Sequence, residues 1–132
     1  LSDYGHHPTE IHATLQGLKN DTDQKILAIV EIHTQQRLAT FQKEFAIALA
    51  SANGVLFTPV FIPTGRENET QQASQQLQKL SYDLNRQGIP TWNASSYDNT
   101  VKLLKEIGRN YDLAILFSAG PADRFFKSNL DS

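Results

Sequence analysis

The sequence predicts an α/β fold with a mostly parallel β-sheet that is covered by helices on both faces. Short apolar runs rich in β-branched residues alternate with longer stretches in which apolar residues recur every three or four positions. This alternation is typical of βαβ units, whose crossover helices pack on a parallel sheet. With 132 residues, of which 39% are hydrophobic and 20% charged, residues 1–132 are expected to form a single globular domain.

The first helix is expected to begin at Pro8, because proline suits the first turn and Glu10 favours the positive end of a helix. The apolar face of this helix consists of Ile11, Leu15 and Leu18. The next run, at residues 25–32, is continuously apolar and rich in β-branched residues. It therefore predicts a strand that is buried on both faces.

A single helix is predicted from about residue 37 to residue 52. Its apolar stripe consists of Leu38, Phe41, Phe45 and Leu49. Asn53 and Gly54 tolerate the left-handed conformation and are expected to form its C-cap. Residues 54–61 predict a second strand, which should lie at an edge or end near Pro59 because proline has no N–H to donate to a neighbouring strand.

Residues 62–68 contain proline, glycine and polar residues and predict a loop. A helix is expected from about residue 69 to residue 87, with Gly88 ending it. Its buried face is predicted to consist of Ala73, Leu77, Leu80 and Leu84. Its other face is expected to be solvated and is rich in glutamine, with Gln71, Gln72, Gln75, Gln76 and Gln78.

A short strand is expected at residues 89–93, and Ser96 is a suitable N-cap for the helix that follows it. This helix should end at Gly108, and its apolar positions are Val101, Leu104 and Ile107. Residues 111–117 predict the last strand. Pro121 then suits the first position of a final helical segment.

Ligands of parallel sheets bind at the carboxyl ends of the strands. In this sequence those ends are residues 33–36, 62–66, 94–96 and 118–121. The small residues of 118–121 either allow a ligand to approach the backbone or simply connect a strand to a helix.

Composition excludes several classes of function. The net charge of −2 gives no basic surface for nucleic acid or anionic membranes, and the longest apolar runs, of about eight residues, are too short to span a bilayer. Cysteine is absent, and the four histidines do not have the spacing of zinc ligands. Neither common phosphate-binding glycine motif occurs. We therefore expect no nucleic-acid partner, no membrane partner and no metal site in this chain.

Two features could carry chemistry. Residues 3–7 place an acid, a phenol and two imidazoles around a glycine just before a helix, where they form either a ligand site or a solvated loop. The adjacent histidines His6 and His7 are potential hydrogen-bond donors there. Arg37 follows the first long strand at the ligand-facing end and is either an anion clamp or a surface charge.

The string Asp-Tyr-Gly-His-His-Pro-Thr-Glu-Ile at residues 3–11 closely resembles the start of the C-terminal domain of the Mur ligases of peptidoglycan synthesis. The stretch at residues 32–39, the Ile-Pro-Thr-Gly turn at residues 62–65 and the Ser-Ala-Gly turn at residues 118–120 resemble further motifs of that family, in the same order. The resemblance covers nearly the whole chain. Because the sequence begins with Leu, we expect the chain to be one part of a longer protein.

The resemblance implies a Rossmann-like domain that closes over a central ATPase domain and an N-terminal UDP-sugar domain. These ligases use ATP and Mg²⁺ to convert the carboxylate of UDP-N-acetylmuramate into an acyl phosphate, which the amine of an amino acid then attacks. The most similar members use L-alanine. The resemblance further implies a cytoplasmic protein in which the central domain holds most of the ATP and Mg²⁺ contacts, so that no catalytic residue lies in this chain.

By the same resemblance, Asp3 and Tyr4 bind the nucleotide, and Tyr4, His6 and Arg37 bind the substrate. Arg37 would hold the carboxylate of the incoming amino acid. Thr34 and Ala39 stand where the family has arginines. A related ligase that recycles murein tripeptide and a diverged non-catalytic binding module therefore remain alternatives, whereas the missing glycine fingerprint disfavours a nucleotide-dependent oxidoreductase.

Overall fold

The structure is a computed structural model that describes residues 2–3, 7–21, 23–118 and 121–122. Its strands form one sheet in the order β1-β5-β2-β3-β4, and every pairing is parallel. The strands are β1 (Ser2–Asp3), β2 (Ile26–Val30), β3 (Gly54–Phe57), β4 (Thr91–Asn93) and β5 (Leu113–Phe117). The predicted α/β class is confirmed. The short strand β1 was not predicted, because two residues carry no periodicity.

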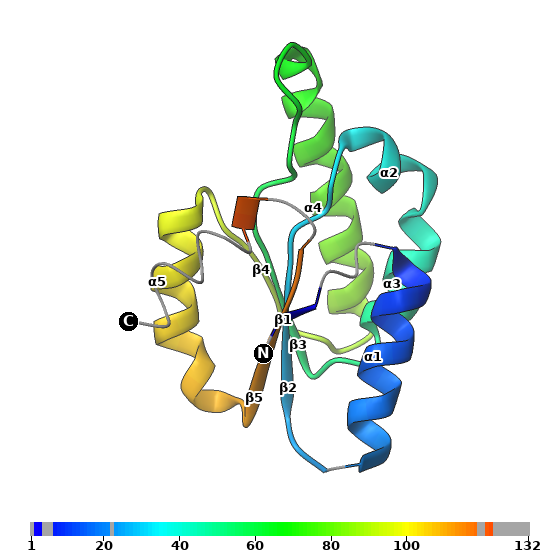
Figure 1. The fold of residues 1–132 in the computed structure, drawn as a ribbon, viewed down its shortest axis with the longest axis vertical. Helices are drawn as coiled ribbons and strands as arrows, with labels where there is room; N and C mark the ends of the chain where they lie inside the picture. Colours follow the sequence, from blue (N-terminus) through cyan, green and yellow to red (C-terminus); the bar gives the residue numbers. More distant parts are fainter. Residues whose placement is uncertain (1, 4–6, 22, 119–120, 123–132) are drawn as a thin grey trace.

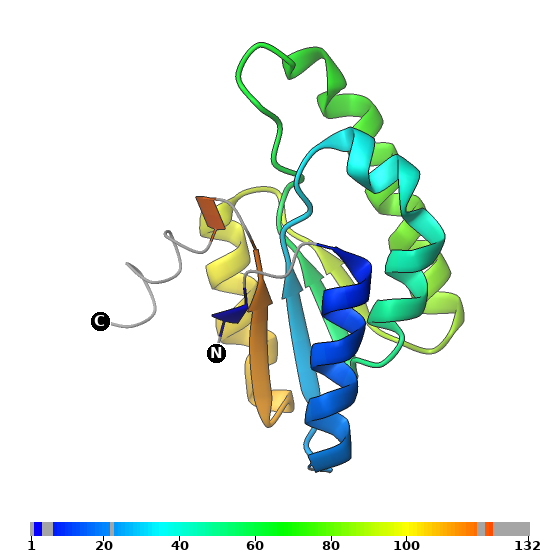
Figure 2. The same ribbon diagram turned by 45° about the vertical axis from the view of Figure 1, so that its right-hand side comes forward.

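Helices cover both faces of the sheet. Figures 1 and 2 show α1, α3 and α4 on one face and α5 on the other, with α2 beyond the carboxyl end of β2. The helices are α1 (Pro8–Asp21), α2 (Gln35–Thr40), α3 (Gln42–Leu49), α4 (Thr70–Arg86) and α5 (Tyr97–Ile107), with the short 3₁₀ turns η1 (Glu67–Glu69) and η2 (Gly108–Asn110). Within the described residues, none of these helices is long and apolar enough to cross a bilayer.

The core is divided between the two faces of the sheet. Side chains alternate along a strand, so Ile26, Ala28 and Val30 of β2 face α1, α3 and α4, whereas Leu27 and Ile29 face α5. All five residues of β2 are buried. The prediction of a strand buried on both faces is therefore confirmed for β2.

The prediction of a single helix at residues 37–52 is wrong. Two helices, α2 and α3, lie in this segment, with a break at Phe41 where φ is −113° and ψ is 26°. The Phe41 N–H donates to the Arg37 carbonyl at 3.0 Å and its carbonyl accepts from the Phe45 N–H at 2.8 Å, so one residue caps both helices. No glycine or proline marks the break. It lets α3 pack on α1 while α2 packs on α4.

The predicted left-handed cap at Asn53 and Gly54 is also wrong, because α3 already ends at Ala50 in a right-handed conformation. Asn53 instead binds the start of β2: its Oδ1 accepts from the Ile26 N–H at 2.8 Å, and its own N–H donates to the Ile26 carbonyl at 2.9 Å. Gly54 opens β3, and a Cβ there would collide with the ring and hydroxyl of Tyr111. Glycine is therefore required at position 54, because the Tyr111 side chain occupies the space that a Cβ would need.

The remaining elements follow the predicted pattern with shorter bounds. Strand β3 ends at Phe57, before Pro59, as the missing N–H of proline requires. The buried face of α4 is confirmed, Gly88 after it has a φ of +85°, and the Ser96 Oγ caps α5 by accepting from the Asn99 N–H at 3.0 Å.

The glutamine-rich face of α4 is solvated, with one correction. Gln76 is half-buried and its side-chain oxygen accepts from the Gln35 amide at 3.4 Å, while its backbone carbonyl accepts from the Gln42 amide at 2.6 Å. Gln76 therefore joins α4 to both α2 and α3. The other four glutamines of this face are exposed: Gln71, Gln72, Gln75 and Gln78.

Candidate functional site

A pocket of about 390 Å³ lies between the start of α1 and the start of α2, which follows the carboxyl end of β2. Its lining comes from two segments that are far apart in the sequence. The residues that line it are His7, Thr34, Gln36, Arg37, Thr40 and Phe41, and we call it the His7–Arg37 pocket.

His7 is held in this pocket by its role as the N-cap of α1. Its Nδ1 accepts a hydrogen bond from the Thr9 N–H at 3.2 Å, and its carbonyl accepts from the N–H groups of Glu10 and Ile11 at 3.0 and 3.1 Å. The ring also packs edge-on against Phe41, with 4.9 Å between the ring centroids. Because Nδ1 is an acceptor, the proton of the neutral ring is assigned to Nε2, which is then a donor.

Thr34 forms the pocket wall opposite α1 and has an unusual backbone conformation. Its φ is +73°, which is rare for a β-branched residue and costs about 1–3 kcal/mol. Two hydrogen bonds hold it there: its N–H donates to the Phe61 carbonyl at 2.9 Å, and its Oγ1 accepts from the Arg37 N–H at 3.2 Å. This conformation starts α2 and places Arg37 in its first turn.

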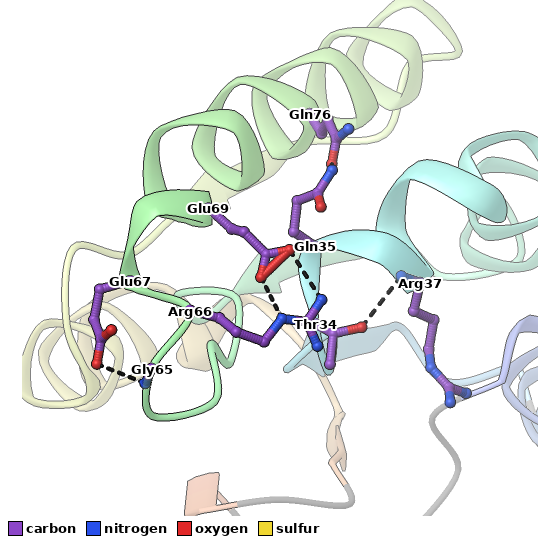
Figure 3. A network of polar contacts seen from close by, with 8 residues as sticks. All are labelled: Thr34, Gln35, Arg37, Gly65, Arg66, Glu67, Glu69 and Gln76. Atoms are coloured by element: carbon purple, nitrogen blue, oxygen red, sulfur yellow. Dashed lines mark hydrogen bonds and ion pairs between the residues drawn. The ribbon is translucent and has the colours of Figure 1, made fainter.

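Arg37 is half-buried, and within the described part of the chain no carboxylate forms an ion pair with its guanidinium. In Figure 3 its side chain points away from Arg66 and Glu69 and toward the ribbon of α1. The guanidinium of such a residue can bind a carboxylate or phosphate through charge-assisted hydrogen bonds.

Arg66, the other cation near this edge, is already paired. Its Nε and Nη2 donate to the two carboxylate oxygens of Glu69 at 2.5 and 2.9 Å, and this hydrogen bonding raises the pKa of Arg66 (Figure 3). Next to it, the Gly65 N–H donates to Glu67 at 3.0 Å and lowers the pKa of the Glu67 carboxyl. Arg66 therefore holds its own loop together, which leaves Arg37 as the better anion-binding candidate.

A buried carboxylate lies at the neighbouring strand ends. Glu31 follows β2 directly and is 2% exposed. Its Oε2 accepts from the Tyr97 hydroxyl, and its Oε1 accepts from the Ser118 hydroxyl at 2.6 Å and from the Ala122 N–H at 3.3 Å. The sequence interpretation missed this residue, although a charged residue at the end of a fully apolar run is a visible signal.

Burial and the hydrogen bond to Glu31 raise the pKa of Tyr97 well above its ordinary value of 10. The folded chain therefore keeps this proton at a pH at which the unfolded chain loses it, so the free energy of unfolding is expected to decrease as pH rises above about 10. Urea titrations from about pH 8 to about pH 11 would measure this decline. It should be shallower in the Tyr97→Phe variant, and equal declines in both proteins would contradict the assignment.

A second pocket, of about 340 Å³, lies at the carboxyl ends of β3 and β4 beneath the first half of α4. No ionisable side chain lines it. Its residues are Pro59, Val60, Ile62, Thr70, Ala73, Ser74, Leu77, Gln78, Asn93, Ala94 and Ser95.

The structure describes only some of the predicted site residues. Arg37 lines the His7–Arg37 pocket, and the backbone of Asp3 pairs with Phe117 in β1, at the carboxyl end of β5. Tyr4 and His6 lie outside the described residues, so the shared site predicted for Asp3, Tyr4, His6 and Arg37 remains a prediction. His7, the neighbour of His6, is the residue that the structure places beside Arg37.

Thr34 and Ala39, the two positions at which the resemblance leads us to expect arginines, are not equivalent in the structure. Thr34 lines the pocket, whereas Ala39 is exposed on α2 and does not line it. Thr34 therefore contributes a neutral side chain to the pocket lining. Among the described residues, no group of three His, Asp or Glu side chains could hold a metal ion.

Curated relatives share the sequence over most of this chain. It is similar to the UDP-N-acetylmuramate–L-alanine ligases of Clostridium kluyveri, with 30% identity over 120 residues, and of Caldanaerobacter subterraneus subsp. tengcongensis, with 32% identity over 121 residues. Each match covers 91% of this chain and 25% of the relative. The chain thus spans about a quarter of the length of these relatives.

Solved structures share the fold. A domain from a proposed UDP-N-acetylmuramate:L-alanyl-γ-D-glutamyl-meso-diaminopimelate ligase of Haemophilus ducreyi matches with a TM-score of 0.64 and 24% identity, over 98% of this chain and 86% of that one. A murein peptide ligase of Psychrobacter arcticus matches with a TM-score of 0.67 and 22% identity, over 98% of this chain and 26% of that one. Residues 1–120 match the family model described as "Mur ligase, glutamate ligase domain". The chain therefore belongs to the Mur ligase family and corresponds to its C-terminal domain.

Proposed function

We propose that this chain is the C-terminal domain of an ATP-dependent ligase that joins an amino acid, L-alanine, to UDP-N-acetylmuramate in peptidoglycan synthesis. In this proposal residues 1–132 are one domain of a cytoplasmic protein, and the central and N-terminal domains supply the catalytic groups. Family membership and the L-alanine ligases among the relatives support the reaction class.

The observation that carries the proposal is the state of Arg37 in the His7–Arg37 pocket. Arg37 is half-buried and its guanidinium has no carboxylate partner among the described residues, so it can bind the carboxylate of the acceptor amino acid. Two parallel hydrogen bonds would fix the carboxylate and thereby orient the amine for attack. The Nε2–H of His7 is a second donor to the same ligand.

The described residues do not provide a site for Mg²⁺, and the sequence has no glycine motif for the ATP phosphates. In this proposal the chain binds and orients the acceptor, while other domains of the longer protein hold most of the ATP and Mg²⁺ contacts. Asp3 and Tyr4 are the proposed nucleotide contacts of this chain.

The 132-residue chain alone is expected to show no ligase turnover and only weak ATP binding, because the phosphate-binding and magnesium-binding groups are elsewhere. The measurement is formation of ADP in the presence of UDP-N-acetylmuramate, ATP, Mg²⁺ and L-alanine, with calorimetry for ATP. ADP formation that depends on both acid and amine would contradict the assignment.

The complete protein tests the substrate. Rates of ADP formation should be compared with L-alanine, L-serine, glycine and the peptide L-alanyl-γ-D-glutamyl-meso-diaminopimelate as acceptors. The peptide is the second candidate, because the murein peptide ligase shares this fold. Preference for L-alanine supports the proposal, and preference for the peptide replaces it. No turnover with any acceptor would favour the non-catalytic binding module.

A further inference from the structure

Glu31 accepts hydrogen bonds from three separate segments of the described chain. Tyr97 is the first residue of α5, Ser118 follows β5, and Ala122 lies in the helical segment after it. Both carboxylate oxygens are used, and the Glu31 N–H donates to the Phe117 carbonyl at 3.0 Å. One side chain thus joins the ends of β2 and β5 to the start of α5.

Packing alone does not account for a carboxylate at this position. Glu31 is 2% exposed, and within the described residues no cation forms an ion pair with it. Burial of a charge is costly unless hydrogen bonds replace its hydration, and an apolar residue of similar size would fill the same volume at no such cost. The specific gain from Glu31 is therefore the set of hydrogen bonds that it accepts.

The location of Glu31 connects these hydrogen bonds to the end of the sheet at which ligands bind. After β2 the chain continues into α2 and α3, and α3 lies on the face of α1 and α4, whereas Ala122, beyond β5, is buried with Leu27 and Leu116 on the face of α5. Adjacent parallel strands whose connections leave toward opposite faces form a crevice at their carboxyl ends, and ligands of open α/β sheets bind there. Glu31 follows β2 directly and binds Ser118, which follows β5, so it lies at the carboxyl ends of these two strands.

We propose that Glu31 is a positioning residue that fixes the chain leaving β5, and the start of α5, against β2. It thereby fixes the arrangement of the strand ends of β2 and β5, where ligands of such sheets bind. Glu31 itself is too buried to touch a ligand. The part of this proposal that concerns turnover rests on the proposed ligase function, whereas the fixing of the Ser118 and Ala122 segment does not.

Amide hydrogen exchange in the 132-residue chain tests the fixing. Glu31→Leu retains the volume and removes the acceptor, so the Ala122 amide should exchange about tenfold faster relative to the Thr58 amide, which donates to the Val30 carbonyl in the adjacent strand. Glu31→Gln retains an acceptor oxygen and should stay within about threefold of the original chain. Equal acceleration at Thr58, or no acceleration at Ala122, overturns the proposal.

Tyr97→Phe keeps the test decisive if Glu31→Leu does not fold, because this substitution conserves shape. It removes the donor to Oε2 and should accelerate exchange of the Thr100 amide, in the first turn of α5, about threefold relative to Thr58. An unchanged ratio in that variant overturns the fixing of α5.

In the complete protein, Glu31→Leu should lower kcat about tenfold with a smaller change in the KM of each substrate, and Glu31→Gln should restore most of it. An unchanged kcat overturns the role in turnover. If the complete protein has no ligase activity, the proposed function fails. The exchange ratios still show whether Glu31 fixes the Ser118 and Ala122 segment, so the two failures are distinguishable.

Discussion

Replacing Arg37 with alanine in the complete protein is expected to raise the KM of the acceptor amino acid about 10- to 100-fold and to change the KM of ATP much less. A hydrogen bond to a charged group is worth about 1.5–3 kcal/mol, and every 1.4 kcal/mol is a factor of ten in binding. Arg37 lines the His7–Arg37 pocket, where the acceptor carboxylate is proposed to bind. Initial rates with the acceptor and ATP varied separately measure both constants.

Arg109→Ala is the matched control for this prediction. Arg109 is an exposed arginine in η2, directly before β5 and therefore at the opposite edge of the sheet from the pocket. Its removal changes the net charge equally and should leave both KM values within about twofold, because surface charges that are far from a ligand are screened. Equal effects of Arg37→Ala on the acceptor and ATP, or the same effect from Arg109→Ala, would count against the proposed role.

Replacing Leu49 with alanine is expected to lower the free energy of unfolding of the 132-residue chain by about 2–5 kcal/mol. Leu49 is 0% exposed and belongs to the core between α3 and the sheet, so truncation leaves a cavity. Urea unfolding followed by circular dichroism measures the change.

Ile47→Ala is the control on the same helix and removes the same number of atoms. Ile47 is 66% exposed, so its truncation should change the free energy of unfolding by no more than about 0.5 kcal/mol. Similar losses at Leu49 and Ile47 would mean that α3 does not present its faces as described.

Local patterns were sufficient to predict most of the elements. Pro8 starts α1 and Ser96 caps α5, because both choices depend on backbone groups within one turn of the residue itself. The buried face of α4 follows from the spacing of its apolar residues, which is a property of the helix alone.

The same patterns could not predict the break at Phe41 or the role of Asn53. An unbroken helix satisfies the apolar stripe as well as two helices do, and only the packing of α3 on α1 and of α2 on α4 selects the break. Asn53 carries a residue type that suits a left-handed cap, but it meets the Ile26 N–H, 27 positions earlier in the chain. In both cases a tertiary contact overrode the local preference.

The sequence by itself determined the alternation of strands and helices, the parallel sheet and the resemblance to the Mur ligases, because periodicity and short motifs are encoded within windows of a few residues. Only the tertiary structure decided that His7 and Arg37 share a pocket and that Glu31 binds Ser118 across 87 positions. Such groupings depend on strand order and on which face each connection crosses. These are settled by the packing of the whole core, which no single segment specifies.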